Sequence, residues 1–221
     1  MSIVLVKLGG AVAGDAADAV LALAERHAVC VVHGAGPQIS AEMGRRGIPV
    51  EFVGGRRVTT PEGLEVVRES LAEVNAVVCA ALGEVAAPLF GDEIGLRAKP
   101  VPELGLVGEA LPSRPPAVAD ALARRRIPVV APLAIGPLNV NADDAAAALA
   151  IGLGAERLFF FTDVPGLLLG GAVASSILAA DAERLLDAGE LGGGIVPKLR
   201  AAIDAARGGV EAEIGATAVL A

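Results

Sequence analysis

The sequence predicts an α/β fold, a three-layer αβα sandwich around a mostly parallel central sheet. Two observations lead to this prediction: β-branched apolar runs alternate along the chain with Ala-rich segments of helical spacing, and those runs are continuously apolar. Continuous apolar runs are typical of parallel strands that helices cover on both faces. With 221 residues, of which 54% are apolar and 20% charged, the chain also has enough apolar material for such a core.

The predicted elements follow one another in strand-helix order. Strands are expected at Ser2–Lys7, Val29–His33, Ile127–Pro132 and Arg157–Thr162. Helices are expected at Asp15–His27, Gln38–Arg46, Thr60–Phe90, Pro116–Arg126 and Asn141–Gly154. Because Gly and Pro interrupt short apolar pieces between Ile94 and Leu111, that stretch is predicted to be a hairpin excursion and not a separate domain.

The longest predicted helix starts at Thr60, a cap-like residue followed by Pro61 in the first turn. We expect this helix to run nearly to Phe90. Its surface is rich in Ala and Val, so one face can pack inside the subunit and another against a second subunit. We therefore expect a homodimer, although a helix buried within one subunit is an equally ordinary interpretation.

Charge and composition exclude several classes of partner. A net charge of −8 and the lack of Trp and Tyr argue against nucleic acid and against an anionic membrane surface. Cys30 and Cys79 lie in predicted buried elements and form no disulfide framework. Lys7 and the glycines after it interrupt the apolar N-terminus, so neither a signal peptide nor a membrane span is expected. We expect a cytoplasmic protein.

Four predicted strands end in polar or glycine-rich loops. These loops are Lys7–Gly10, His33–Pro37, Leu138–Asp144 and Thr162–Gly166. In an open α/β sheet the ligand crevice lies beyond the carboxyl ends of the strands, so the loops are expected to face one cleft. A helix start, as predicted after Leu138–Asp144, also binds anions through its free N–H groups. An enzyme is therefore the leading interpretation.

Three basic positions are candidates for binding anionic groups. Lys7, followed by Gly9 and Gly10, suits a phosphate, although many strand ends carry a lysine and a tight turn for ordinary reasons. Lys198 lies just inside a predicted helix, where a cation opposes the helix dipole, and this favours a phosphate partner. The pair Arg56–Arg57 suits two-point binding of a carboxylate, with a solvated basic pair as the plain alternative.

Other cofactor chemistry is disfavoured. The segment Gly34–Ala35–Gly36 offers backbone N–H groups but is not the six-residue dinucleotide pattern, so NAD is not expected. The chain has two histidines, which makes a His-based metal site on the protein improbable. His33 is interpreted as a hydrogen-bonded residue at a strand end.

Taken together, the motifs resemble those of the acetylglutamate kinases of the amino-acid kinase superfamily. In order along the chain they are VKLGG, VHGAGPQ, GRRVT, LNVNADDAA, TDVPGLL and GGGIVPKL. The resemblance covers nearly the whole chain. It implies transfer of the ATP γ-phosphoryl group, with Mg²⁺, to the side-chain carboxylate of N-acetyl-L-glutamate in arginine biosynthesis. It also implies an N-terminal lobe, 1–137, for the amino acid and for dimerisation, and a C-terminal lobe, 138–221, for the nucleotide, on one continuous sheet.

The same resemblance assigns roles to individual residues. Lys7 and Lys198 would neutralise the transferring phosphoryl group, and Asp143 would hold both lysines in position. The amino acid would be bound by Ala35, Gly36, Arg57 and Asn139. The nucleotide would be bound by Gly9, Gly10, Asp163, Val164, Pro165, Gly166, Leu167 and Leu168. An acceptor carboxylate is already ionised at neutral pH, so the reaction needs charge neutralisation and no general base.

The chain departs from the family pattern in four places. Ala35 replaces a usual glycine, the excursion at Ala134–Pro137 is short, and the chain passes almost directly from Val210 to Ile214, where relatives insert a strand and a helix. The sequence also begins at the first strand, whereas the hexameric, arginine-inhibited members of the family carry an N-terminal helix before it. We therefore expect a dimer without arginine feedback. Two alternatives stay open: a kinase for a carrier-linked glutamate or aminoadipate, and a catalytically weak regulatory protein of the same fold.

Overall fold

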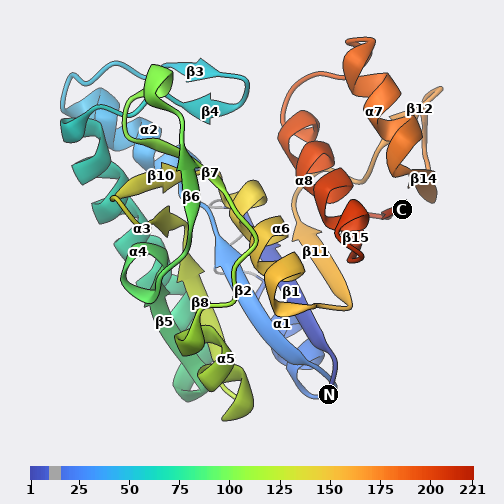
Figure 1. The fold of residues 1–221 in the computed structure, drawn as a ribbon, viewed down its shortest axis with the longest axis horizontal. Coiled ribbons are helices and arrows are strands. Elements are labelled where there is room, and N and C mark those ends of the chain that lie inside the picture. The colour runs from blue at the N-terminus through green and yellow to red at the C-terminus, as the bar shows by residue number, and fades with distance from the viewer. Residues whose placement is uncertain (10–15) are drawn as a thin grey trace.

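A computed structural model describes residues 1–9 and 16–221 of the chain. Within them, eight strands form one sheet in the order β14-β16-β15-β11-β1-β2-β8-β5 (Figure 1). Their bounds are β1 Ile3–Leu8, β2 Ala28–His33, β5 Ala86–Phe90, β8 Ile127–Ala131, β11 Arg157–Phe161, β14 Ser176–Leu178, β15 Glu211–Ile214 and β16 Thr217–Leu220. All neighbours are parallel except β15 and β16. The predicted mostly parallel sheet is confirmed.

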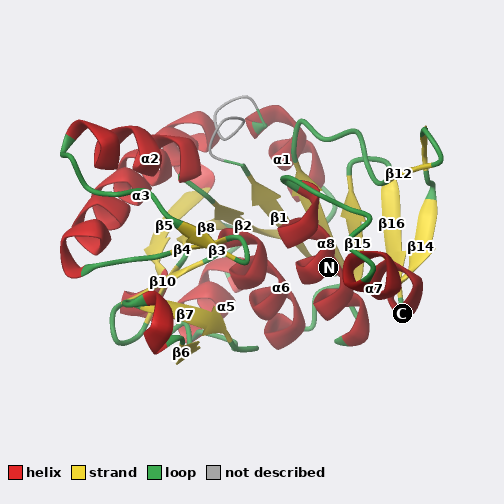
Figure 2. Cartoon of the chain, turned by 90° about the horizontal axis from the view of Figure 1, so that it is seen from above, coloured by secondary structure: helices red, strands yellow, loops and turns green. Residues whose placement is uncertain are grey.

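Helices cover both faces of this sheet (Figure 2). One layer consists of α1 Ala17–Ala24, α2 Gly36–Arg45 and α3 Pro61–Leu82. The other consists of α5 Pro116–Ala123, α6 Ala142–Leu153, α7 Ala179–Asp187 and α8 Ile195–Arg207. The one-turn helix α4, Gly91–Ile94, follows β5. The predicted three-layer sandwich is therefore confirmed.

The core explains why the strand sequences are continuously apolar. Successive residues of β1 point to opposite faces, so Leu5 packs into the cluster formed with α6 and α8, and Val6 into the cluster formed with α3. On β2, Cys30 likewise packs into the first cluster and Val31 into the second. Because both faces are covered, every position of these strands favours an apolar side chain.

Smaller sheets surround the main one. A four-stranded sheet has the order β6-β7-β10-β9 and consists of β6 Ala98–Pro100, β7 Val107–Ala110, β9 Leu133–Ala134 and β10 Leu138–Val140. The antiparallel pair of β6 and β7 confirms the hairpin predicted between Ile94 and Leu111. Two further hairpins consist of β3 Phe52–Val53 with β4 Arg56–Arg57, and β12 Leu168–Leu169 with β13 Ala172–Val173.

The predicted helix over Thr60–Phe90 is wrong in its last eight residues, Gly83–Phe90. Thr60 does cap α3, since its side chain accepts a hydrogen bond from the Gly63 N–H, but the helix ends at Leu82. Gly83 follows with a φ of 68°, a 3₁₀ turn covers Gly83–Val85, and Ala86–Phe90 forms strand β5. Ala86 and Ala87 continue the Ala-rich composition of α3, and Pro88 follows them. Pro88 fits β5 because this strand lies at the sheet edge, where a missing N–H breaks no ladder.

The C-terminal elements lie together at one end of the molecule, in orange and red in Figure 1. Strands β15 and β16 form a tight antiparallel hairpin across Gly215–Ala216, in the segment that the sequence predicts to be short. The division of the chain into functional lobes at residue 137 stays a prediction. Among the described residues, no helix is long and apolar enough to cross a membrane.

Candidate active site

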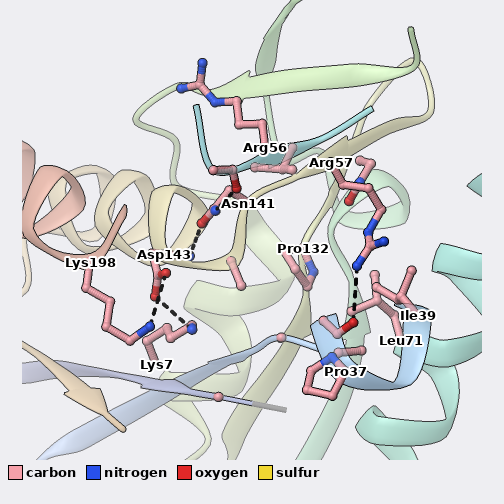
Figure 3. Close-up of a pocket in the computed structure, with 18 of the residues that line it drawn as sticks. Lys7, Pro37, Ile39, Arg56, Arg57, Leu71, Pro132, Asn141, Asp143 and Lys198 are labelled. Carbon is pink, nitrogen blue, oxygen red and sulfur yellow. Dashed lines mark hydrogen bonds and ion pairs between the residues drawn. The ribbon is translucent and has the colours of Figure 1, made fainter. Parts of the chain in front are cut away.

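The loops that follow the strands converge on a single cleft of about 420 Å³ (Figure 3). The cleft lies beyond the carboxyl ends of β1, β2 and β11 and beside the start of α6. Nine of the predicted site residues line it: Lys7, Gly9, Ala35, Gly36, Arg57, Asn139, Asp143, Asp163 and Lys198. The expectation that these loops face one cleft is confirmed.

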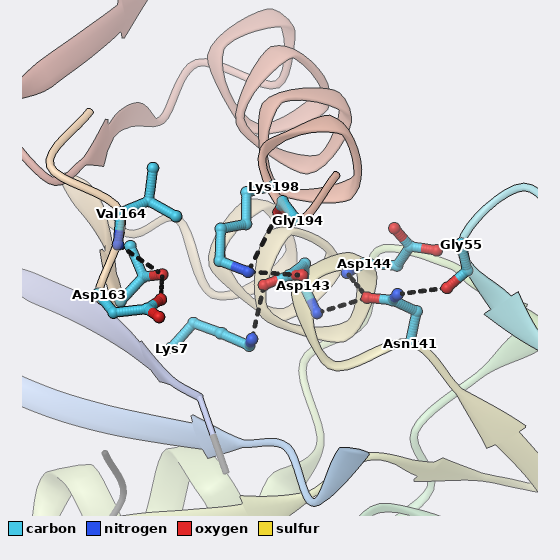
Figure 4. A network of polar contacts seen from close by, with 10 residues as sticks. Lys7, Gly55, Asn141, Asp143, Asp144, Asp163, Val164, Gly194 and Lys198 are labelled. Carbon is cyan, nitrogen blue, oxygen red and sulfur yellow. Dashed lines mark hydrogen bonds and ion pairs between the residues drawn. The ribbon is translucent and has the colours of Figure 1, made fainter. Parts of the chain in front are cut away.

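Two lysines share one carboxylate at one end of the cleft (Figure 4). Lys7 Nζ lies 2.8 Å from Asp143 Oδ1, and Lys198 Nζ lies 3.8 Å from Asp143 Oδ2. All three side chains are largely buried. Since two cations face one anion, this lysine–aspartate cluster carries a net charge of +1, which suits a further anion in the cleft.

Local sequence places the cluster. Asn141 caps α6, because its side-chain oxygen accepts hydrogen bonds from the N–H groups of Asp143 and Asp144. This cap fixes Asp143 in the first helical turn, where the helix dipole favours a carboxylate. Lys198 lies in the first turn of α8, where burial lowers its pKa and Asp143 opposes that shift. A cation at this end of a helix is unfavourable without an anionic partner.

Arg57 projects from β4 into the other side of the cleft. Its Nη2 donates to Ser40 Oγ at 2.8 Å and to the Gly36 carbonyl at 3.2 Å. The Phe52 ring stacks on the guanidinium at 4.6 Å. These contacts orient the planar group toward the start of α2.

Burial makes Arg57 a strong candidate for binding an anion. Its side chain is only 6% exposed, and desolvation lowers its pKa. In the part of the chain that the structure describes, no carboxylate forms an ion pair with it. Buried charges are normally paired, so the cleft offers a guanidinium that is prepared for a carboxylate ligand.

Comparison with known proteins agrees with this geometry. The sequence pattern described as the amino acid kinase family matches residues 2–215. The chain belongs to this family. The acetylglutamate kinase of Rubrobacter xylanophilus is 44% identical over an alignment of 224 positions, which covers 97% of this chain and 88% of the relative. The acetylglutamate kinase of a Nocardioides species is 43% identical, over 81% of this chain and 64% of the relative. The expected family and enzyme class, a kinase, are confirmed.

A solved structure extends the comparison to the fold. The crystal structure of smu.665 from Streptococcus mutans UA159 superimposes with a TM-score of 0.90 at 26% identity, covering 99% of this chain and 98% of that one. The two proteins thus share their fold over nearly the full length of both chains, including the C-terminal hairpin. The Ala35 that replaces a usual glycine is also compatible with this fold, because the φ of Ala35 is −140°, a value open to any residue.

Only some of the residues predicted to bind the nucleotide line the cleft. Gly9 and Asp163 line it, whereas Gly10 lies outside the described residues. Val164, Pro165 and Gly166 continue the loop after β11, and Leu168 is exposed on β12. Leu167 is buried in the core, and its N–H donates to Thr217 Oγ1 at 2.8 Å. The role of this loop in nucleotide binding stays a prediction.

Sequence reasoning did not single out several residues that build the site. Ser40 supports Arg57 from one helical turn beyond Gly36. Buried Thr59 donates to the Arg57 carbonyl at 2.8 Å and accepts a hydrogen bond from Asn139 Nδ2 at 3.0 Å. Thr59 therefore links two predicted amino-acid-binding residues. The sequence does contain a signal for this contact: Thr59 comes two residues after Arg57, and threonine hydroxyls commonly form hydrogen bonds with the nearby backbone.

His33 confirms its plain interpretation as a hydrogen-bonded residue at a strand end. It is fully buried, and Asn75 Nδ2 donates to its Nε2 at 3.0 Å. Burial lowers its pKa to about 4, so the imidazole is neutral at pH 7. His33 therefore adds no positive charge beside Lys7.

Proposed function

We propose that this chain transfers the γ-phosphoryl group of ATP to the side-chain carboxylate of N-acetyl-L-glutamate and forms N-acetylglutamyl 5-phosphate, a step of arginine biosynthesis. The names of its relatives support this reaction. The observation that carries the proposal is that one cleft contains both the lysine–aspartate cluster and a buried Arg57. A phosphoryl group and a second carboxylate can then be bound at the same time.

The residues take the following roles in this proposal. Lys7 and Lys198 bind the oxygens of the transferring phosphoryl group, and Asp143 holds their ammonium groups in place. Arg57 binds the α-carboxylate of the acceptor. The backbone at Ala35 and Gly36 and the amide of Asn139 bind its remaining polar groups. The loop Asp163–Leu168, with Gly9 and Gly10, binds the nucleotide.

The chemical step needs no proton transfer. The ionised side-chain carboxylate of the acceptor donates an electron pair to the γ-phosphorus, and the bond to the β–γ bridging oxygen breaks, so its electrons leave on ADP. Both the attacking oxygen and the leaving group are anionic at neutral pH. The barrier is therefore charge repulsion, which the two lysines reduce because they are fixed before the reaction begins.

Mg²⁺ fits this site as a companion of the nucleotide. The described residues contain no group of three or more His, Cys, Asp or Glu side chains that could hold a metal ion. Asp143 is engaged by both lysines. We therefore infer that ATP phosphates supply most ligands of Mg²⁺, with the exposed Asp163 as the assisting carboxylate. When bound, Mg²⁺ would neutralise phosphate charge.

We also propose a cytoplasmic homodimer. Both cysteines are free, as in reducing compartments. Helix α3 has an exposed stripe of small apolar residues, Ala76, Val77, Ala80 and Ala81, which suits packing against the same helix of a second copy. Light scattering would test this: a dimeric mass is expected for the wild type and a monomeric mass for Val77→Lys. A monomeric wild type would contradict the proposal.

The first experiment compares acceptors. ADP release with Mg²⁺-ATP is measured for N-acetylglutamate, glutamate, N-acetylaspartate and 2-aminoadipate derivatives, and acyl phosphate is trapped with hydroxylamine. We expect trapped product with N-acetylglutamate, and its loss in Lys198→Ala. The variant Asp120→Asn, on the exposed face of α5, serves as the matched control and should retain activity.

The other outcomes separate the alternatives. Product with a carrier-linked glutamate or aminoadipate but not with N-acetylglutamate would replace the acceptor and keep the kinase chemistry. Binding of N-acetylglutamate without turnover of any acceptor would favour a regulatory protein.

A further inference from the structure

The β3–β4 hairpin lies over the cleft and carries two adjacent arginines. Arg57 points into the cleft, whereas Arg56 leaves β4 in the opposite direction (Figure 3). The hairpin itself is short, with two residues in each strand and a turn at Gly54–Gly55. A hairpin with so few backbone hydrogen bonds is only weakly stable by itself. Its position therefore depends on contacts with neighbouring elements.

Arg56 supplies such contacts on the outer side. Its Nη2 lies 3.2 Å from Asp144 Oδ2 and 3.0 Å from Glu109 Oε1, and its Nε lies 3.4 Å from Asp144 Oδ2. Asp144 belongs to the first turn of α6 and Glu109 to β7. Arg56 therefore ties the hairpin to two separate elements of the protein body. We call these three residues the hairpin latch.

Two further contacts join the tip of the hairpin to the phosphoryl end of the cleft. Asn141 Nδ2 donates to the Gly55 carbonyl at 3.4 Å (Figure 4). A Cβ on Gly55 would lie 3.7 Å from Pro197 Cβ, which places the turn directly against the residue before Lys198. The hairpin thus spans the distance between the residues around Arg57 and those around Lys198.

Consecutive residues of α6 connect the two halves of this arrangement. Asp143 pairs with Lys7 and Lys198, and the next residue, Asp144, pairs with Arg56. Asn141 caps the same turn and also contacts the hairpin. One helical turn consequently fixes both the lysines and the hairpin that carries Arg57.

We propose that Arg56 is a positioning residue: through Asp144 and Glu109 it holds the β3–β4 hairpin so that Arg57 keeps a fixed separation from the lysine–aspartate cluster. This inference rests on the proposed function. An acceptor with two carboxylates must reach Arg57 and the phosphoryl group at once, so that separation selects the chain length between its carboxylates. Arg56 also lines the cleft, but its guanidinium is already paired with Asp144 and Glu109.

The test breaks the latch from both sides: Asp144 lies outside the lining of the cleft, whereas Arg56 is part of it, so Asp144→Asn is the variant that leaves the cleft lining unchanged. The variants are Asp144→Asn, Arg56→Met and their combination, with Arg56→Lys as the conservative form and Asp120→Asn as the control. For each, kinetics are measured with N-acetylglutamate and N-acetylaspartate. Hydrogen exchange of residues 51–59 is measured without any ligand, and calorimetry measures acceptor binding.

We expect faster exchange over residues 51–59 in Asp144→Asn and Arg56→Met. The KM for N-acetylglutamate should rise about 10-fold, the effect of losing roughly 1.4 kcal/mol of positioning, with the KM for ATP unchanged. The preference for N-acetylglutamate over N-acetylaspartate should shrink, because a loose hairpin no longer fixes the separation. Arg56→Lys should recover part of each effect. The double variant should resemble Arg56→Met, because Asp144 acts on the hairpin through Arg56.

The outcomes distinguish this inference from the proposed function. Unchanged exchange in the single variants would overturn the latch whether or not the enzyme turns over. Faster exchange with unchanged acceptor affinity and preference would also overturn it, because the hairpin would then have only a structural role. A wild type that binds but does not phosphorylate N-acetylglutamate would overturn the proposed function, while exchange and calorimetry would still decide on the latch.

Discussion

Asp143 and Lys7 form the shortest ion pair of the cleft, with 2.8 Å between Oδ1 and Nζ. The two residues come from the first turn of α6 and from β1, and both are almost completely buried. The carboxylate also approaches Lys198 at 3.8 Å. Without Asp143, two ammonium groups would face each other in a site of low polarity, which is costly.

Replacing Asp143 by Asn should therefore damage both stability and catalysis. Breaking a buried ion pair by removing one partner costs about 3–5 kcal/mol, and displacing preorganised cations lowers kcat about 10²–10³-fold. Urea unfolding and steady-state kinetics measure the two effects. Asp120→Asn controls for the loss of a surface charge. A variant with wild-type kcat would show that the lysines do not depend on Asp143.

Arg57→Gln should abolish stabilisation of the protein by its acceptor. A ligand that binds the folded state stabilises it by RT ln(1 + [L]/Kd), about 2.7 kcal/mol at a concentration 100 times Kd. We expect N-acetylglutamate to raise the melting temperature of the wild type and to leave that of Arg57→Gln unchanged. ATP should still raise the melting temperature of the variant. An equal shift by N-acetylglutamate in both proteins would remove Arg57 from the acceptor site.

The sequence was sufficient to predict most of the elements around the cleft. The strands β1, β2, β8 and β11 are confirmed to within one residue at each end, because the apolar runs of β1, β2 and β11 end at polar or glycine-rich loops and that of β8 ends at Pro132. Capping by Thr60 is confirmed as well. Signals of this kind are local, so they can be recognised without the fold.

The remaining features depend on tertiary contacts. Ala86–Phe90 has the composition of a helix, and its strand forms because β8 offers a partner along its edge. Both arginines of the pair Arg56–Arg57 were candidates for a carboxylate. Only the fold distinguishes them. Arg57 is buried and has no carboxylate partner among the described residues, whereas Arg56 forms ion pairs with Asp144 and Glu109.

Gly166→Ala should disturb the loop after β11. The φ of Gly166 is 145°, and a Cβ there would lie 2.6 Å from Thr217 Oγ1. That hydroxyl accepts the Leu167 N–H and donates to the Ala174 carbonyl, so it cannot easily move away. We expect a loss of about 1–3 kcal/mol in unfolding free energy from backbone strain and a raised KM for ATP. Gly192→Ala, in open space, is the control. An unaltered KM for ATP would separate this loop from the nucleotide.

Asp144 should make the stability of the protein depend on pH in a defined window. Burial raises its pKa from 3.8 to about 6; Asp143 and Asp204 act in the same direction, and Arg56 opposes them. The folded state therefore binds this proton more tightly than the unfolded state does. The stability that the proton confers is complete below pH 3.8 and is lost as the pH rises through about 6.

Urea unfolding of the wild type and of Asp144→Asn between pH 4 and 7 measures this contribution, because most other titrating groups cancel in the difference. The advantage of the variant over the wild type should grow as the pH rises to about 6 and then stay constant. The same titration should appear in the KM of the wild type for the acceptor. This KM should rise below pH 6, because a proton on Asp144 weakens its pairing with Arg56. The KM of Asp144→Asn should not show this rise. Parallel pH profiles for the two proteins would contradict both expectations. The ionised form of Asp144 thus lowers stability in the pH range where it supports the hairpin, as expected of a charge kept for function rather than for folding.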